Sequence, residues 1–384
     1  MTPSPTAGLL QAARDLGPLL RRHAAEGDRQ RELPREVVDA LRSAGIFRMW
    51  VPRALGGAEL DYPAGLEVLE ELARHDGAAA WVVFVAATGA PLLSRLSDEA
   101  AAQVLGDPDA IVCGSLHPPG RATPVPGGHR LQGRWSYVSG CGHASWLALS
   151  ALVEGGAAGP HLFVVPAGQA QVVDTWHTGG LRGTGSHDVT VADVFVPTGW
   201  HFAMAPGATR SRHHQGALYR LPAYGFLGTP VAAVALGLAR TALDALVEMA
   251  TAKVPVGRTG TLREQQTTQV AVARAQAHVA SARAWLFQLA SQLWDEVQHG
   301  RPVPADSAAQ LMLASSHAAW SAAAAVDQVQ KTAGASAVYS ANPIERAFRD
   351  IHAVTQHRRV AEVSFETVGR TLLGLEAGDP VLKL

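Results

Sequence analysis

The chain has 384 residues, a formal net charge of −1 and a hydrophobic content of 47%. This length and composition predict a globular protein of two or three domains with a substantial core. The balanced charge excludes the basic surface with which proteins bind nucleic acids or anionic membranes. Only 17% of the residues are charged, against about 25% in typical domains, so we expect oligomer contacts to cover part of the surface.

Cysteine use and the N-terminal sequence predict a cytoplasmic location. The two cysteines, Cys113 and Cys141, are too few for a disulfide framework and suit a reducing compartment. Met1–Leu20 is not expected to be a signal peptide, because Arg14 and Asp15 interrupt its apolar residues. No membrane span is expected either, since we find no run of about 18 apolar residues without charge.

Residues 1–108 are predicted to be helical. Pro34 suits the first turn of a helix, and apolar side chains then recur at helical spacing until Gly45 ends the pattern. Two further helices are predicted over residues 63–75 and 97–106, the second opening on a serine that is a typical N-cap.

Residues 109–205 have a different character, with short apolar runs between turn residues. Strands are predicted over 146–152 and 161–165, and a further strand alternates until its phase slips at Ala192–Asp193, as in a β-bulge. This zone is predicted to be a small antiparallel β-domain.

Residues 206–384 are predicted to form a bundle of long helices rich in alanine, whose small side chains allow close packing. The longest pattern would span about 57 Å at 1.5 Å per residue. The four helical patterns cover residues 230–250, 262–299, 304–333 and 343–373. The fold class is therefore α+β, mostly α.

Three motifs occur in order along these zones: QGRWSYVSG at 132–140, LRGTGSHDV at 181–189 and NPIERAFRD at 342–350. Together they resemble the acyl-CoA dehydrogenase superfamily across nearly the whole chain. The resemblance implies an N-terminal helical domain, a central small antiparallel β-barrel domain and a C-terminal four-helix bundle, with boundaries at 1–108, 109–205 and 206–384.

The GTGSxDV motif and the histidine that follows the Arg-Asp pair resemble the group D two-component monooxygenases. This branch includes the oxygenase component of p-hydroxyphenylacetate hydroxylase and dibenzothiophene monooxygenase. The resemblance implies an oxygenase that accepts reduced flavin, FAD or FMN, from a separate flavin reductase. With O₂ it would hydroxylate an aromatic or polycyclic small molecule through a C4a-hydroperoxyflavin.

The resemblance also assigns residues of the β-domain to the flavin. Ser139 matches the hydroxyl that faces the flavin in this family, and its hydroxyl would bond flavin N5, with Tyr137 and Gly140 beside it. Ser115 matches a second strand that lines the flavin, and His117 would face the substrate. Each also has an ordinary structural alternative, such as a turn hydroxyl or a strand-end hydroxyl.

The segment after Asp350 separates two kinds of chemistry. Many acyl-CoA dehydrogenases carry their catalytic glutamate eight residues after this aspartate, where this chain has Arg358. An arginine stays protonated and cannot act as a base. His357, just before it, matches the histidine that faces substrate and flavin in the monooxygenases, and its imidazole suits proton transfer. The alternatives are a histidine on a helix surface and, for a dehydrogenase, Glu248 as the base.

The segments that hold the adenine end of FAD in dehydrogenases depart from the family pattern. Gln330–Ser336 has one glycine where several are expected, and Arg258 stands in an altered loop. The resemblance therefore implies a loosely held flavin, with Arg258 as a phosphate contact or a solvated loop arginine. No dinucleotide fingerprint and no metal-ligand spacing is found, so we expect neither nicotinamide nor metal.

Two other functions stay open on the sequence. A dehydrogenase of acyl-CoA or acyl-carrier substrates would hold oxidised FAD tightly and purify yellow. A non-catalytic structural homologue would bind no flavin at all.

The low charge content and the alanine-rich helices predict a homo-oligomer, and the resemblance implies a homotetramer. Light scattering at micromolar concentration is expected to give the mass of four chains. A monomer under these conditions would contradict the prediction.

Overall fold

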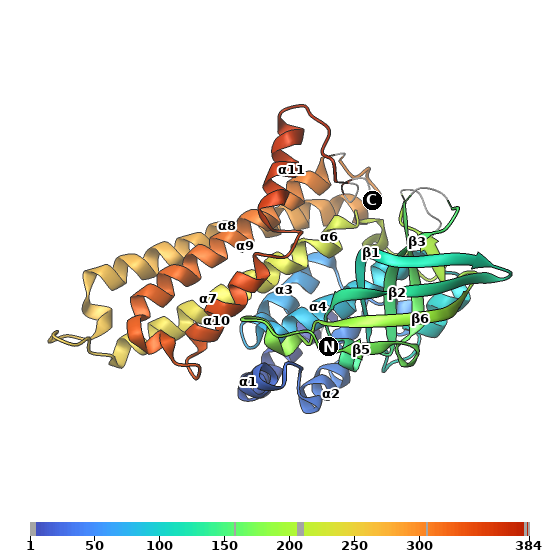
Figure 1. The fold of residues 1–384 in the computed structure, drawn as a ribbon. Helices are drawn as coiled ribbons and strands as arrows, with labels where there is room; N and C mark the ends of the chain where they lie inside the picture. Colours follow the sequence, from blue (N-terminus) through green and yellow to red (C-terminus); the bar gives the residue numbers. More distant parts are fainter. Residues whose placement is uncertain (1–4, 157–158, 206–210, 305, 380–381, 383–384) are drawn as a thin grey trace.

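The computed structural model describes residues 5–156, 159–205, 211–304, 306–379 and 382. An elongated bundle of helices lies on one side and a curved β-sheet on the other, with the N-terminal helices against both (Figure 1). The N-terminal helices are α1 (Pro5–Gln30), α2 (Arg35–Ser43), α3 (Tyr62–Ala73), α4 (Gly77–Leu92) and α5 (Asp98–Leu105).

The predicted helix starts are confirmed. Helix α2 begins directly after Pro34, and Ser97 caps α5 by accepting a hydrogen bond from the backbone N–H of Ala100 at 3.2 Å. Asp76 is the N-cap of α4, and its carboxylate accepts a hydrogen bond from the N–H of Ala78 at 3.1 Å. Almost every residue of α4 is buried, so this helix forms the centre of the molecule.

Seven strands form one sheet in the order β5-β6-β2-β1-β3-β4-β7. They are β1 (Val112–Val125), β2 (Gly128–Val138), β3 (Trp146–Val153), β4 (Pro160–Pro166), β5 (Gln171–Val173), β6 (His187–Pro197) and β7 (His201–Ala203). The rings of His129 on β2 and His201 on β7 lie 4.3 Å apart, so the sheet curls toward a barrel.

The prediction of a purely antiparallel β-domain is wrong at one pair of strands. Strands β1 and β3 run parallel, while the other five pairs are antiparallel. The reason is the order of connection: β2 returns along one edge of β1, and the chain then crosses to its other edge.

The predicted bulge is confirmed. The pairing of β2 with β6 shifts register between Leu131↔Val194 and Gly133↔Val191. Asp193 takes a positive φ of 53° at this shift, which accommodates the extra residue.

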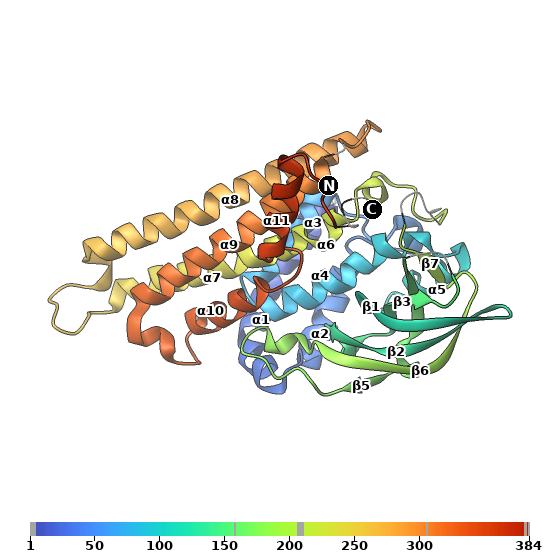
Figure 2. The ribbon, with the colours of Figure 1, turned by 45° about the horizontal axis from the view of Figure 1, so that its top comes forward.

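In the C-terminal half the long helices lie side by side, and a shorter one, α10, packs along two of them (Figure 2). Helix α7 contacts α3 and α9 extensively, and its buried side chains are mostly alanine and leucine. These helices are α6 (Tyr224–Leu227), α7 (Thr229–Ala252), α8 (Gln266–Gln298), α9 (Ser307–Ala333), α10 (Pro343–Val354) and α11 (Glu362–Leu372).

The single helix predicted over 343–373 is wrong, because the chain breaks between α10 and α11. The Arg359 carbonyl accepts a hydrogen bond from the hydroxyl of Tyr224 at 2.7 Å. The next carbonyl, that of Val360, accepts from the indole N–H of Trp320 at 3.0 Å. Side chains from two other helices thus take the carbonyls that a continuous helix would use.

Two helical segments, Gly77–Arg95 and Tyr224–Ala252, are long and apolar enough to cross a membrane by length and composition alone. The fold buries 89% and 72% of their apolar windows. That burial is typical of core helices.

Helix α10 packs closely against the loop that precedes β6. A Cβ on Gly180 would lie 2.1 Å from the carbonyl oxygen of Arg349, so only glycine allows this approach. The guanidinium of Arg349 donates to the carbonyl of Gly179 at 2.6 Å and to Asp28 on α1 at 3.1 Å. The loop is therefore held between α10 and α1.

Gly180→Ala is expected to lower the free energy of unfolding by about 1–3 kcal/mol, because the added methyl group forces α10 away from the loop. Gly179→Ala is the matched control, since a Cβ there meets nothing within 4 Å. The measurement is urea unfolding followed by circular dichroism. Equal stability of the two variants would contradict the close approach.

Candidate active site

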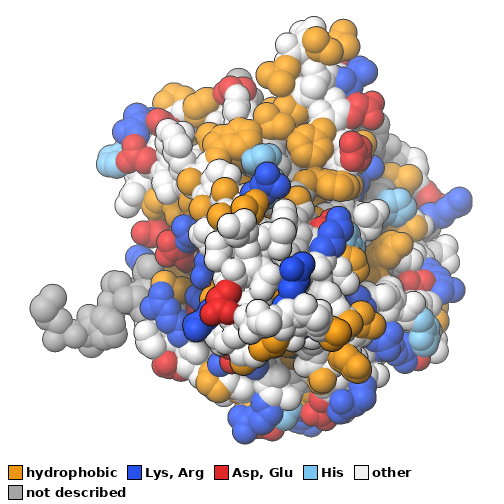
Figure 3. Space-filling view, turned by 90° about the vertical axis from the view of Figure 1, so that its left-hand side faces the viewer, with side chains coloured by type: hydrophobic (Ala, Val, Ile, Leu, Met, Phe, Trp, Pro, Cys, Tyr) orange, Lys and Arg blue, Asp and Glu red, His pale blue; other side chains and the backbone are white. Residues whose placement is uncertain are grey.

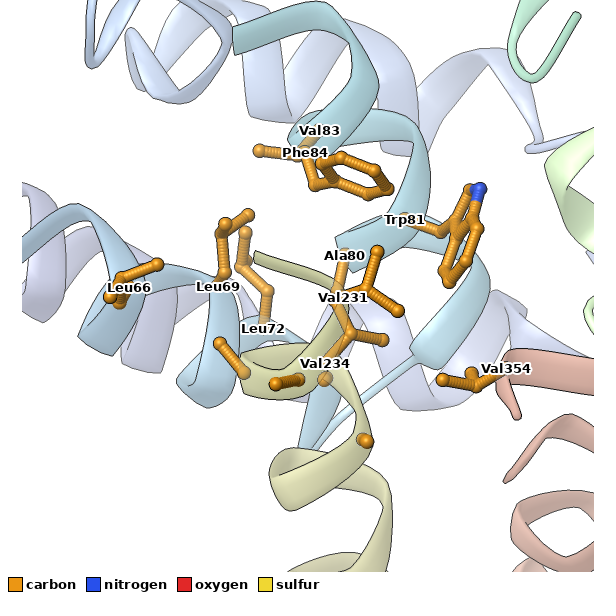
Figure 4. Packing of buried hydrophobic residues seen from close by; sticks show 14 of the residues in the cluster. Leu66, Leu69, Leu72, Ala80, Trp81, Val83, Phe84, Val231, Val234 and Val354 are labelled. Atoms are coloured by element: carbon orange, nitrogen blue, oxygen red, sulfur yellow. The ribbon is translucent and has the colours of Figure 1, made fainter. Parts of the chain in front are cut away.

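Four segments that are distant in the sequence meet beside the centre of α4. Helix α4 contributes Trp81 and Phe84, whose rings lie next to each other, with Val354 of α10 on the other side of Trp81 (Figure 4). Ser139 directly follows β2, and His357 lies in the break after α10. The fourth segment is the loop 178–186, which precedes β6.

A chain of hydrogen-bonded hydroxyls joins these segments. The indole N–H of Trp81 donates to Ser139 Oγ at 3.2 Å, and Ser139 Oγ lies 2.6 Å from Ser186 Oγ. Ser186 Oγ lies 2.7 Å from Thr184 Oγ1, which donates to the carbonyl of Leu181 at 2.8 Å. We call Ser139, Ser186, Thr184 and the Leu181 carbonyl the hydroxyl chain.

Glycines and left-handed backbone fold the loop into this shape. Leu181 and Gly185 take positive φ values of 50° and 52°, so the loop turns sharply on both sides of Thr184. The N–H of Gly140 donates to the carbonyl of Thr184 at 2.8 Å and ties the loop to the end of β2.

His357 presents its ring to this aromatic cluster. Its centroid lies 5.3 Å from that of Trp81 and 6.5 Å from that of Phe84, in both cases edge to face. Burial, and then the positive charge of Arg359, lower the pKa of His357 to about 4. The imidazole is therefore neutral near pH 7.

The hydrogen bonding of His357 also indicates its tautomer. The backbone N–H of Arg359 points at His357 Nδ1, 3.4 Å away, so Nδ1 is the acceptor and Nε2 carries the proton. The nearby guanidinium of Arg359 pairs with Asp379 at 2.9 Å. The side chain of His357 thus offers an N–H donor at its free edge.

Asp350 anchors the loop from α10. One of its carboxyl oxygens accepts from the N–H of Leu181 at 2.6 Å, at the residue whose carbonyl ends the hydroxyl chain. Asp350 is buried, and this burial, together with the nearby Asp76, raises its pKa to about 7 despite that hydrogen bond.

Tyr137, Ser139 and Gly140 lie at the end of β2, and their assigned contacts with the flavin stay predictions. Gly140 has a φ of 75°, and a Cβ there would lie 3.0 Å from Val82 and 3.1 Å from Cys113 Sγ, so the position requires glycine. Tyr137 is 73% exposed, and its ring lies 6.1 Å from that of Trp176.

Ser115 and His117 lie on β1, which continues through Pro118 to Val125. The pairing of β1 with β3 shifts register between Ser115 and Gly120, so this stretch leaves the regular ladder. His117 is exposed and Ser115 half-buried. Their assigned contacts with flavin and substrate stay predictions.

Arg258 lies far from the other predicted residues. It stands in the exposed loop between α7 and α8, at the end of the bundle opposite the sheet (Figure 1). Glu248, the alternative dehydrogenase base, is exposed on α7. His352 faces away from His357, because it pairs with Asp327 of α9 at 2.9 Å.

Sequence reasoning missed Trp81, Thr184, Ser186 and Asp350 as parts of this site. The last three stand in the quoted motifs, where a glycine-rich loop with two hydroxyls was a signal of a built hydrogen-bond array. No sequence pattern pointed to Trp81, because the apolar helix that contains it is typical of an ordinary core helix.

The pH dependence of stability tests the burial of Asp350. Its pKa is about 7 in the folded chain against an ordinary value of 3.8. Between these values the unfolded chain has lost the proton that the folded chain keeps, so the free energy of unfolding falls as the pH rises. Asp350→Asn removes this contribution to the pH dependence, and the asparagine side chain can still accept a hydrogen bond from the N–H of Leu181.

Relative to Asp350→Asn, the wild type is expected to lose about 2–4 kcal/mol between pH 4 and pH 7. Urea unfolding of both proteins across this range measures the difference. Contributions from His357 cancel because both proteins contain it. Parallel stability curves would contradict the raised pKa.

Comparisons with known proteins support the family that the sequence motifs resemble. The family model of the acyl-CoA dehydrogenase N-terminal domain matches residues 12–107, and that of the C-terminal domain matches residues 230–362. Indole-3-acetate monooxygenase of Pseudomonas putida is 35% identical, covering 95% of this chain and 92% of the relative. The oxygenase component of an FADH(2)-dependent resorcinol hydroxylase of Rhizobium sp. is 31% identical, covering 93% and 92%.

Solved structures give the same result. The 3-HSA hydroxylase from Rhodococcus sp. RHA1 aligns with a TM-score of 0.91 at 28% identity, covering 97% of this chain and 99% of that chain. XiaF from Streptomyces sp., in complex with FADH2 and glycerol, aligns with a TM-score of 0.92 at 28% identity, covering 98% and 97%. The predicted fold and family are confirmed: the chain belongs to the acyl-CoA dehydrogenase-like flavoproteins, in the branch of the flavin-dependent monooxygenases.

Proposed function

We propose that this chain is an oxygenase component that takes reduced flavin from a separate flavin reductase and hydroxylates an aromatic small molecule with O₂. The observation that carries the proposal is the neutral imidazole of His357, which lies edge to face with Trp81, one residue before the position where many dehydrogenases place a glutamate. The relatives named for indole-3-acetate and resorcinol favour an aromatic substrate.

The residues at the end of β2 fit a flavin. Ser139 Oγ accepts from Trp81 and bonds to Ser186, which leaves one lone pair for a ligand. Tyr137 exposes a flat ring beside Trp176, and Gly140 leaves its own position free of a side chain. When bound, reduced flavin would activate O₂ and supply the oxygen atom that is transferred.

His357 would hold and orient the substrate. Its Nε2–H can donate a hydrogen bond to a substrate oxygen, while Trp81 and Phe84 offer apolar ring faces and edges. The lowered pKa keeps this donor neutral, so proton uptake by His357 requires a bound anion close to its ring.

A dehydrogenase would need a carboxylate base, and the two positions considered do not supply one. The side chain of Arg358 is 69% exposed and lies 3.8 Å from Asp379. Glu248 is exposed on α7, away from Trp81 and Ser139.

We also propose that Arg258 meets a phosphate of a flavin held by another copy of the chain. Arg258 lines a groove of about 730 Å³ between the α7–α8 loop, α8 and α9, and Lys331 lines the same groove. Two positive side chains at one groove suit a phosphate. FAD and FMN differ at the phosphate end of the cofactor, so a preference between the two cofactors would arise at this groove.

Exposed hydrophobic side chains at the same end of the bundle support the proposal of a homotetramer. Hydrophobic side chains lie among Lys and Arg side chains on this face (Figure 3). Val254 and Val256 of the α7–α8 loop and Val338 and Tyr339 after α9 are each more than half exposed. Such a patch favours burial against another copy. The proposed location of the assembly and its reductase is the cytoplasm.

His357→Ala is expected to lower hydroxylation of a supplied aromatic acid about 100-fold or more, because the substrate loses its hydrogen-bond donor. The assay uses indole-3-acetate, FAD or FMN, NADH and a flavin reductase, with product measured by chromatography. Anaerobic binding of reduced flavin should change no more than a few-fold.

His352→Ala is the matched control, since this histidine pairs with Asp327 on the surface. Turnover of His357→Ala within a few-fold of the wild type would remove His357 from the mechanism. Wild-type oxidation of a saturated acyl-CoA with an artificial electron acceptor would overturn the proposed function.

A further inference from the structure

We propose that the hydroxyl chain fixes Ser139 as a hydrogen-bond acceptor toward the flavin and thereby selects reduced flavin over oxidised flavin. This inference rests on the proposed function, in which Ser139 faces flavin N5. It assigns the selection to Thr184 and Ser186, which lie behind Ser139 in the loop before β6.

The direction of the hydroxyl chain follows from counting protons. Thr184 Oγ1 donates its one proton to the carbonyl of Leu181, which can only accept. Ser186 must therefore donate to Thr184 across their 2.7 Å contact. Ser139 must in turn donate to Ser186 across their 2.6 Å contact.

The other neighbour of Ser139 agrees with this direction. The indole N–H of Trp81 is a donor only, so it occupies one lone pair of Ser139 Oγ. The proton of Ser139 is already committed to Ser186. Toward a ligand, Ser139 therefore has one lone pair and no proton.

This polarity matches one redox state of flavin. Reduced flavin carries a proton on N5 and donates a hydrogen bond, whereas N5 of oxidised flavin has only a lone pair and accepts one. Opposite Ser139 Oγ, reduced flavin gains a hydrogen bond, and oxidised flavin places two lone pairs against each other.

Reversal of the proton direction along the hydroxyl chain is unfavourable, because the Leu181 carbonyl at its end can only accept and the three hydroxyls are buried away from solvent. For Ser139 to donate to N5, Thr184 would have to abandon the carbonyl of Leu181. Ser139, Thr184 and Ser186 are 5%, 1% and 4% exposed, so no bulk solvent compensates for the lost bond.

The acceptor at the end of the chain is itself held from two sides. The Leu181 N–H donates to Asp350 at 2.6 Å, and the Leu181 carbonyl accepts from the indole N–H of Trp176 at 3.0 Å. The two peptide groups that flank Leu181 therefore cannot rotate without breaking one of these bonds, so the polarity of the hydroxyl chain is set by the fold.

The experiment compares the dissociation constants of oxidised and reduced FMN and FAD, the latter measured anaerobically. The wild type is expected to bind the reduced form at least about tenfold more tightly, which corresponds to about 1.4 kcal/mol. Thr184→Val removes the terminal donor, so Ser186 and Ser139 can turn their protons toward N5. The preference should then fall to within about threefold, mainly through tighter binding of oxidised flavin.

Thr184→Ser is the matched control, because it keeps the hydroxyl and should keep the wild-type preference. Ser186→Ala frees the proton of Ser139 by a separate change and should also reduce the preference, which keeps the test decisive if Thr184→Val does not fold. Wild-type preference in both Thr184→Val and Ser186→Ala would overturn the proposal.

The failures of the two proposals are distinguishable. A wild type that binds both redox states equally would overturn the role of the hydroxyl chain and leave the flavin site standing. A wild type that binds neither state would overturn the proposed function itself.

Discussion

The bond between the Asp350 carboxyl group and the N–H of Leu181 supports the rest of the site. On one side it fixes the left-handed turn whose carbonyl receives the proton of Thr184. On the other side it holds the end of α10, and the chain that leaves α10 delivers His357 to Trp81. One buried contact thus sets both the hydroxyls and the imidazole relative to α4.

Burial of the Asp350 carboxyl group at this contact has an electrostatic cost, which a nearby positive charge reduces. Asp76 and Asp350 are both buried, and burial raises the pKa of each. The positive charge of Arg346 acts in the opposite direction on both carboxyl groups. Arg349 also lowers the pKa of Asp350, but two buried acids near each other still cost stability that an apolar pair would keep.

Local patterns predicted the elements whose cause is local. Helices α2 and α5 and the bulge at Asp193 follow from caps, spacing and a phase slip within a few residues of each feature. The break after α10 was missed because Tyr224 and Trp320, both distant in the sequence, take its carbonyls. The hydroxyl chain was missed for the same reason, since its members come from separate segments. The pKa of His357 could not be predicted either, because burial is a property of the assembled fold.

In the proposed function, two local features set the polarity that the site presents to its ligands. A glutamate base beside the flavin would bring a negative charge that accepts a proton from carbon. His357, with its pKa lowered to about 4, would bring a neutral hydrogen-bond donor instead of a carboxylate base. The hydroxyl chain is the second feature, because it leaves Ser139 as an acceptor toward the proposed flavin. Neither feature depends on a change of helix or strand. In this proposal the reaction is set by which atoms of His357 and Ser139 carry a proton.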